Sequence, residues 1–225
     1  PRSTLFPYTT LFRSLFIFGR AKVSLPGGCA WGPRPVNLHI EAMKKLGADI
    51  DFKDEYIIAE SKKLHGTKIN FDVSSVGATG NAMMAATLAK GTTLINNAAI
   101  EPEITQLAQF LTKMGAKING IGTNKIEIEG VSELSPTEIT TIPDRVETGT
   151  LLIAAAITNS EITLTNTSSE FLEAVLLKLE DAGCKINRDK NLLSLDAKNI
   201  ELNPISITTS IFPGFPTDMQ AQWTA

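Results

Sequence analysis

A five-residue motif recurs three times in this chain at a constant spacing, and this repetition constrains the possible folds more than any other feature. Each copy has a glycine in its second position and an isoleucine in its last. The copies are LGADI (46–50), MGAKI (114–118) and AGCKI (182–186), so their glycines lie 68 residues apart in both intervals. Self-similarity at a fixed period is typical of a chain built from repeated supersecondary units.

The residues on either side of each glycine predict the same elements in all three copies. Apolar residues spaced by three or four precede the glycine and predict an amphipathic helix, with the glycine as a left-handed C-terminal cap. Residues typical of β-strands follow at 50–52, at 118 with 126–129, and at 186 with 192–195, and they favour hairpins across short polar turns. The apolar positions are Val36, Ile40, Met43 and Leu46 in the first copy, Ile104, Leu107, Leu111 and Met114 in the second, and Leu172, Val175, Leu176 and Leu179 in the third.

Between these copies lies a second kind of helical segment, GNAMMAATL (80–88) and GTLLIAAA (149–156), which is hydrophobic nearly all round. Such segments predict buried helices. Each leads into a strand, at 92–96 and 162–166, so the repeated unit is interpreted as βαβαββ over about 68 residues. One unit alone leaves its sheet and buried helix partly uncovered. The sequence therefore predicts an α/β fold in which several units pack their helices inward and their sheets outward.

Composition excludes several classes of protein. The chain has 225 residues, 43% hydrophobic and 20% charged, with 21 basic and 24 acidic side chains for a net charge of −3. This balance disfavours nucleic-acid binding and disorder. The uncharged run at 73–89 is too polar and too short to span a membrane. Two cysteines and no secretory leader favour a reduced, cytoplasmic setting.

Both ends of the sequence look cut. The string TLFPYTTLFRS (4–14) has neither helical nor strand periodicity and matches the translation of a common sequencing adaptor, so residues 1–14 are interpreted as a non-native leader. The last residues, QWTA (222–225), lie within what we expect to be the first turns of a helix.

The segment VSLPGGCAWGPRPVN (23–37) is the strongest candidate for chemistry. Two glycines precede Cys29, and Pro35 suits the first position of the following helix, whose N-terminal amides would point toward the loop. Arg34 and that helix end could bind a phosphate or carboxylate together, and the thiol of Cys29 would lie in the same positive field. The alternative is an exposed loop cysteine with no special reactivity.

Other candidates are weaker. Cys184 stands where the sister copies have Ala48 and Ala116, which predicts a small core residue. Gly27 and Gly32 have the spacing of a nucleotide-binding P-loop, but Pro33 replaces its lysine. The two histidines, His39 and His65, belong to no metal-binding motif, so we predict no metal site and expect His39 to be a partly buried helix residue. Asp144 and Asp218 each precede a helix-like run and could be N-caps instead of functional residues.

Five segments together resemble the UDP-N-acetylglucosamine 1-carboxyvinyltransferase (enolpyruvyl transferase) family. They are VSLPGGCAWGPRPVNLHI (23–40), SSVGATGNAMMAATLAKGTT (74–93), AAIEPEI (98–104), PDRVETGT (143–150) and FPTDMQAQ (215–222). The resemblance runs from about Phe18 to the last residue. It implies an inside-out α/β barrel of βαβαββ units, three per domain, here an incomplete two-domain fragment. Residues 15–142 would be part of the first domain with the catalytic loop, and residues 143–225 part of the second.

The resemblance also implies an activity. The family transfers the enolpyruvyl group of phosphoenolpyruvate to the 3′-hydroxyl of UDP-N-acetylglucosamine and releases phosphate, the first committed step of peptidoglycan synthesis. It implies no cofactor, no metal, and a monomer when full length. Cys29 would be the proton donor and the target of fosfomycin, Asp218 would act on the sugar hydroxyl, and Arg34 would contact the substrate phosphate. The residues implied to hold the UDP-sugar are Arg34, Pro35, Val36, Asn37, Leu38, Val73, Ser74, Ser75 and Val76, with Asp218.

The chain departs from the family at Val73, where members commonly carry lysine, and at Asn37, where they carry aspartate. Family residues outside this chain, a Lys-Asn pair and several arginines, would also be needed, so we expect the fragment alone to be inactive or nearly so. Two alternatives remain. One is the shikimate 3-phosphate enolpyruvyl transferase, which shares the fold but uses no catalytic cysteine. The other is a non-catalytic paralogue that binds UDP-sugars.

Overall fold

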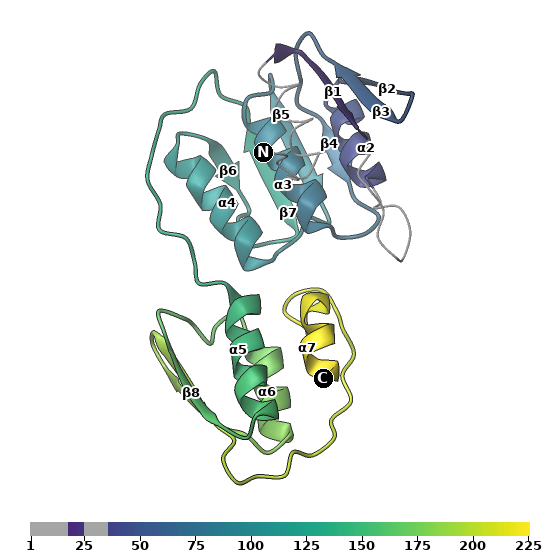
Figure 1. The fold of residues 1–225 in the computed structure, drawn as a ribbon. Coiled ribbons are helices and arrows are strands. Elements are labelled where there is room, and N and C mark those ends of the chain that lie inside the picture. The colour runs from purple at the N-terminus through teal and green to yellow at the C-terminus, as the bar shows by residue number, and fades with distance from the viewer. Residues whose placement is uncertain (1–17, 25–35) are drawn as a thin grey trace, which may run out of the picture. The chain divides into compact units, whose positions relative to one another are not determined.

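The computed structural model describes residues 18–24 and 36–225, and the chain divides into two units between Ile139 and Thr140 (Figure 1). The leader predicted at residues 1–14 lies outside the described residues. The elements of the first unit are β1 (Arg20–Ser24), α2 (Asn37–Lys45), β2 (Asp49–Lys53), β3 (Tyr56–Glu60), β4 (Lys68–Asn70), α3 (Val76–Thr87), β5 (Thr92–Asn96), α4 (Pro102–Lys113), β6 (Lys117–Asn119) and β7 (Lys125–Glu129). The second unit contains α5 (Arg145–Ile157), β8 (Glu161–Thr165), α6 (Glu173–Asp181), β9 (Lys185–Asp189), β10 (Leu192–Asp196), the 3₁₀ turn η1 (Thr217–Met219) and α7 (Gln220–Thr224).

The repeat predicted from the sequence is confirmed by the sheet topology. The strand orders β1-β3-β2, β5-β7-β6 and β8-β10-β9 are the same arrangement three times, with every pair antiparallel. In each copy one amphipathic helix, α2, α4 or α6, connects the first two strands along the chain. The middle copy is a complete βαβαββ unit, because β4 adds to its sheet in parallel with β5 and α3 connects these two strands.

The three glycines of the motif end their helices with the same hydrogen bonds. Gly47, Gly115 and Gly183 have φ of 99°, 108° and 106°, which glycine adopts without the strain that a Cβ would cause. The residue after each glycine donates its N–H to the carbonyl five residues earlier, as in Ala48 N to Met43 O at 3.0 Å. This is the Schellman motif, and it satisfies carbonyls that the helix end would otherwise leave unpaired.

The first unit has one continuous core around α3. Nine of the twelve residues of α3 are buried, and Figure 1 shows this helix between α2 and α4. The largest core side chains are Met43, Leu46, Ile57, Ile69, Met83, Ile95, Ile126 and Ile128, each less than 2% exposed. Burial of such side chains stabilises the fold by about 1.5 to 3 kcal/mol each.

The second unit has a separate core of α5, α6 and the three-stranded sheet. Cys184 is 5% exposed, close to Ala48 at 6% and Ala116 at 5% in the sister copies, so its predicted role as a small core residue is confirmed. The prediction of a buried helix at residues 149–156 is confirmed for most of the segment, but Leu151 and Ala154 on one face are exposed, Leu151 by 40%. Helix α5 is flanked by α6 and by the short α7, which cover less of it than α2 and α4 cover of α3.

Residues 130–144, which lead directly into α5, form no strand, whereas β4 leads into α3. The corresponding segment contains Pro136, which has no N–H to donate to a sheet. In residues 18–24 and 36–225, no helix combines the length and the apolar character that crossing a bilayer requires.

Candidate functional site

Two of the segments implicated by sequence lie at neighbouring helix ends in the first unit. Helix α2 begins at Asn37 after the N-cap Val36, and α3 begins at Val76 after the N-cap Ser75. Asn81 of α3 lies 2.8 Å from Nδ1 of His39 in α2. A Cβ on Gly77 would lie 3.0 Å from Cε1 of the same histidine ring, so the first turns of the two helices are adjacent. The structure therefore brings Val36–Leu38 and Val73–Val76 to the same end of the α2–α3 pair.

The two helix ends are suited to an anion. Neither α2 nor α3 has an acidic residue in its first turn. The hydroxyl of Ser75 accepts the N–H of Ala78 at 3.3 Å and caps α3. The remaining first-turn amides and the positive end of each helix dipole favour a negatively charged group at this position.

The side chains at these ends are a mixture of polar and exposed apolar groups. Asn37 is exposed, and Val36 and Leu38 are half-buried against the core. Val73 and Val76 are 65% and 42% exposed, an uncommon placement for valine. A ligand that carries both phosphates and an uncharged ring would find complementary groups for each part here.

His39 is buried, with 7% of its surface exposed. This burial lowers its pKa from 6.5 to about 4, so the imidazole is neutral near pH 7. An amide nitrogen can only donate, so Asn81 donates to Nδ1 and the ring proton is on Nε2. The expectation of a helix histidine is confirmed, and His39 is more deeply buried than the partly buried residue we expected. Sequence reasoning missed Asn81, although a polar residue inside a segment as apolar as GNAMMAATL was a signal.

Asp218 lies in η1 of the second unit with its carboxylate exposed. The segment around it is attached to α5. The Met219 side chain fills the space where a Cβ on Gly149 would be, and Gln222 Nε2 donates to Thr150 Oγ1 at 3.0 Å. Within the described part of the chain, no hydrogen bond or ion pair engages the Asp218 carboxylate. The buried neighbours hold this residue in place while its acidic group faces solvent.

The alternative role of helix N-cap holds for Asp144 but not for Asp218. Asp144 accepts the N–H groups of Val146 and Glu147 at 2.8 and 3.1 Å, and it is the N-cap of α5. Asp218 makes no capping hydrogen bond, since the N-cap of η1 is Pro216. The structural explanation therefore accounts for Asp144 and leaves Asp218 as a candidate functional residue.

The residues predicted to do the chemistry in the first unit, Cys29, Arg34 and Pro35, lie outside the described residues. Among the residues that are described, no group of three His, Cys, Asp or Glu side chains could hold a metal ion.

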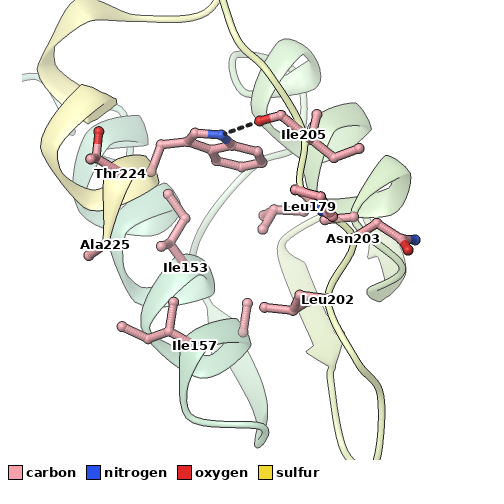
Figure 2. Close-up of a pocket in the computed structure, with 12 residues that line it drawn as sticks. Ile153, Ile157, Leu179, Leu202, Asn203, Ile205, Thr224 and Ala225 are labelled. Atoms are coloured by element: carbon pink, nitrogen blue, oxygen red, sulfur yellow. Dashed lines mark hydrogen bonds between the residues drawn. The ribbon is translucent and has the colours of Figure 1, made fainter.

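A pocket of about 480 Å³ lies in the second unit, apart from the predicted site residues. Figure 2 shows its lining, in which the apolar side chains of Ile153, Ile157, Leu179 and Leu202 are prominent. On one side the Trp223 indole N–H donates to the Ile205 carbonyl at 3.2 Å, the dashed line in Figure 2. The pocket is mainly apolar and its lining includes no acidic or basic side chain, so it has no group suited to acid–base chemistry.

Comparison with protein families gives a match over nearly the whole chain. The model of EPSP synthase (3-phosphoshikimate 1-carboxyvinyltransferase) matches residues 9–225. A UDP-N-acetylglucosamine 1-carboxyvinyltransferase of Chloroherpeton thalassium is 59% identical over 210 residues, 92% of this chain and 49% of the relative. A protein of the same name from Dichelobacter nodosus is 54% identical over 208 residues, again 92% of this chain and 49% of the relative. The chain thus spans about half the length of the curated relatives it matches.

Solved structures share the fold. The enolpyruvyl transferase NikO from Streptomyces tendae superposes with a TM-score of 0.79 over 94% of this chain and 51% of its own, at 19% identity. An EPSP synthase from Acinetobacter baumannii gives a TM-score of 0.55 over 76% of this chain and 41% of its own, at 21% identity. The predicted α/β fold of repeated βαβαββ units is therefore the one that these enolpyruvyl transferases have.

Proposed function

This chain belongs to the EPSP synthase family, and we propose that it is part of an enzyme that transfers the enolpyruvyl group of phosphoenolpyruvate to the 3′-hydroxyl of UDP-N-acetylglucosamine. The observation that carries the proposal is the pairing of two helix N-termini, α2 and α3, in the segments expected to hold a nucleotide sugar. The names of relatives more than 50% identical to this chain support the choice of acceptor.

The reaction needs an acid at the donor and a base at the acceptor. In the addition step Cys29 gives its thiol proton to the methylene carbon of phosphoenolpyruvate while the sugar oxygen bonds to the adjacent carbon. Asp218 accepts the proton that the sugar hydroxyl loses. In the elimination step the new methyl group returns a proton to the Cys29 thiolate and the double bond re-forms. Phosphate leaves with the electrons of its C–O bond and takes up the proton that Asp218 holds, so both side chains regain their starting states. The exposed carboxylate of Asp218, which caps no helix, is available for this role.

The helix ends and Arg34 would bind the charged parts of the substrates. Arg34 and Pro35 come just before the N-cap Val36 in the sequence, and we propose that the Arg34 guanidinium and the α2 helix dipole bind the same phosphate. The exposed side chain of Val76 would contact an uncharged part of the UDP-sugar. This positive field also stabilises the thiolate that Cys29 becomes after it gives up its proton.

The setting we propose follows from the reaction. The product is a precursor of peptidoglycan, which places the step in the cytoplasm at the start of cell-wall synthesis, and the complete protein would act as a monomer. The 225-residue chain spans about half of its relatives, so we expect it to release no phosphate when it is given both substrates by itself.

A second candidate function is binding of UDP-sugars without turnover. Val73 and Asn37 favour it, because neither side chain supplies the charge that the family commonly has at that position. A third, transfer to shikimate 3-phosphate, corresponds to the description of the matching family model.

A chimeric protein distinguishes these three candidate functions. Residues 18–225 of this chain replace the matching part of the Chloroherpeton thalassium relative, and phosphate release from phosphoenolpyruvate is measured with either acceptor. We expect release with UDP-N-acetylglucosamine and none with shikimate 3-phosphate. Release with shikimate 3-phosphate alone would support the third function. A folded chimera that binds UDP-N-acetylglucosamine without releasing phosphate would support the second.

A further inference from the structure

We propose that His39 and Asn81 are a positioning pair, whose hydrogen bond fixes the α2 N-terminus against the α3 N-terminus so that both can hold one UDP-sugar. This inference rests on the proposed function and assigns a role to two residues that the mechanism above does not use. Neither residue needs to touch the substrate, because each acts through the helix end that it holds.

The pair joins the helices at the end where the substrate segments lie. His39 is the third residue of α2 and Asn81 the sixth of α3, and their side chains are 2.8 Å apart. They are 7% and 3% exposed, so water does not compete for the bond. The ring of His39 also lies against Gly77, where an added Cβ would be 3.0 Å from Cε1 and 3.3 Å from Nε2. Movement of the ring would therefore be transmitted to the first turn of α3.

The internal repeat shows that the fold does not require a polar residue at this position. The motif glycines align His39 with Leu107 in α4 and Val175 in α6, and both of these are apolar. Leu107 packs against α3 by van der Waals contact, with Cδ2 3.4 Å from where a Cβ on Gly80 would be. Within the described chain, the copy next to the predicted site is thus the one that uses a buried hydrogen bond at this position.

A buried hydrogen bond fixes the relative position of two helices more closely than an apolar contact does. Apolar surfaces can slide over one another at little cost, whereas a buried donor and acceptor favour one relative position, because any other leaves both groups unpaired. The lowered pKa of His39 supports this role, since a neutral ring keeps Nδ1 available as an acceptor. Loss of the bond should therefore leave the helices packed but their N-termini less well aligned.

The test measures stability and ligand affinity separately in the 225-residue chain. Asn81→Leu keeps the approximate size of the side chain and removes the donor. His39→Asn loses the ring but places an acceptor oxygen near the position of Nδ1. Thr87→Val is the matched control, because it removes a buried hydrogen bond at the far end of α3, from Thr87 Oγ1 to Met83 O at 2.9 Å. Melting temperature is measured by circular dichroism, and the UDP-N-acetylglucosamine dissociation constant by amide chemical shifts of residues 74–77.

We expect all three variants to melt at a lower temperature than the unmodified chain. Only Asn81→Leu should bind UDP-N-acetylglucosamine more weakly, by about tenfold, because that is the effect of losing roughly one buried hydrogen bond. His39→Asn should stay within about threefold of the unmodified chain, because its acceptor is kept. Unchanged affinity in Asn81→Leu, or equal losses in Asn81→Leu and Thr87→Val, would overturn the positioning role alone. If the unmodified chain binds no UDP-N-acetylglucosamine, the same variants are measured in the chimera. Absence of binding by the chimera would overturn the proposed function, and this inference with it.

Discussion

The buried hydroxyl of Thr79 accepts the backbone N–H of Ala99 at 3.0 Å and so attaches α3 to the loop that follows β5. The next copy of the repeat has an equivalent contact, in which Thr148 of α5 lies 2.8 Å from Thr167 in the loop after β8. A threonine in the first half of the buried helix therefore holds the following loop in both copies.

Thr79→Val should destabilise the first unit. The substitution keeps the shape of the side chain and leaves the Ala99 N–H buried without an acceptor, which costs about 1 to 3 kcal/mol. Thr79→Ser is the matched control, because it retains the acceptor oxygen and should lose less. Urea unfolding followed by circular dichroism measures both. Equal losses in the two variants would show that the methyl group, and not the hydrogen bond, is what stabilises this contact.

His39 should make the stability of the first unit depend on pH. Its pKa in the folded chain is about 4, below the value of 6.5 that it regains on unfolding. Between pH 4 and pH 6.5 the unfolded chain binds a proton at His39 that the folded chain does not bind. The contribution of neutral His39 to the free energy of unfolding is therefore complete above pH 6.5 and is lost as the pH falls toward 4. This pKa difference corresponds to about 3 kcal/mol in the free energy of unfolding between a pH above 6.5 and a pH below 4.

Unfolding free energies from pH 7 to pH 4 check this pH dependence, with His39→Gln as the control. The variant cannot titrate in this range and should show a shallower decline than the unmodified chain. Parallel curves for the two proteins would contradict a depressed pKa at His39.

Val73→Lys should strengthen the binding of UDP-N-acetylglucosamine. Val73 is 65% exposed and lies two residues before the N-cap of α3, so a lysine there would add a cation beside the proposed phosphate position. The dissociation constant should fall by about threefold or more at low salt, and the gain should shrink as salt is added. Val73→Gln has a similar length without charge and should bind as the unmodified chain does. An equal gain in both variants would exclude the charge as the cause.

Much of the fold could be predicted from sequence because the same physical pattern occurs three times. The glycines at 47, 115 and 183 mark helix ends that only a residue without a Cβ adopts easily, and each adopts the positive φ that this predicts. A single amphipathic pattern leaves the type and the end of an element ambiguous, whereas three copies with the same spacing indicate one repeated unit. The exposed face of α5 was not predictable, because its apolar composition does not reveal how much of the helix its neighbours cover.

The candidate site could be predicted only in part. The segments at Val36–Leu38 and Val73–Val76 are far apart in sequence, and nothing in their spacing indicates that they meet. The resemblance to a family identified them, and the structure then placed them at one end of the α2–α3 pair. Asn81 was missed because a polar residue in a mainly apolar helix does not reveal its partner, which here lies 42 residues away in the sequence.

The most direct test is the rate of phosphate release by the chimera when the two cysteines that this chain contributes to it are replaced one at a time. Cys29→Ala removes the proposed proton donor and should lower the rate with UDP-N-acetylglucosamine by about a hundredfold or more. Cys184→Ala places in the third copy the residue that the other two already have, and should leave the rate unchanged. Phosphate release by Cys29→Ala as fast as by the unmodified chimera would contradict the assignment of Cys29 as the acid, and with it the proposed mechanism.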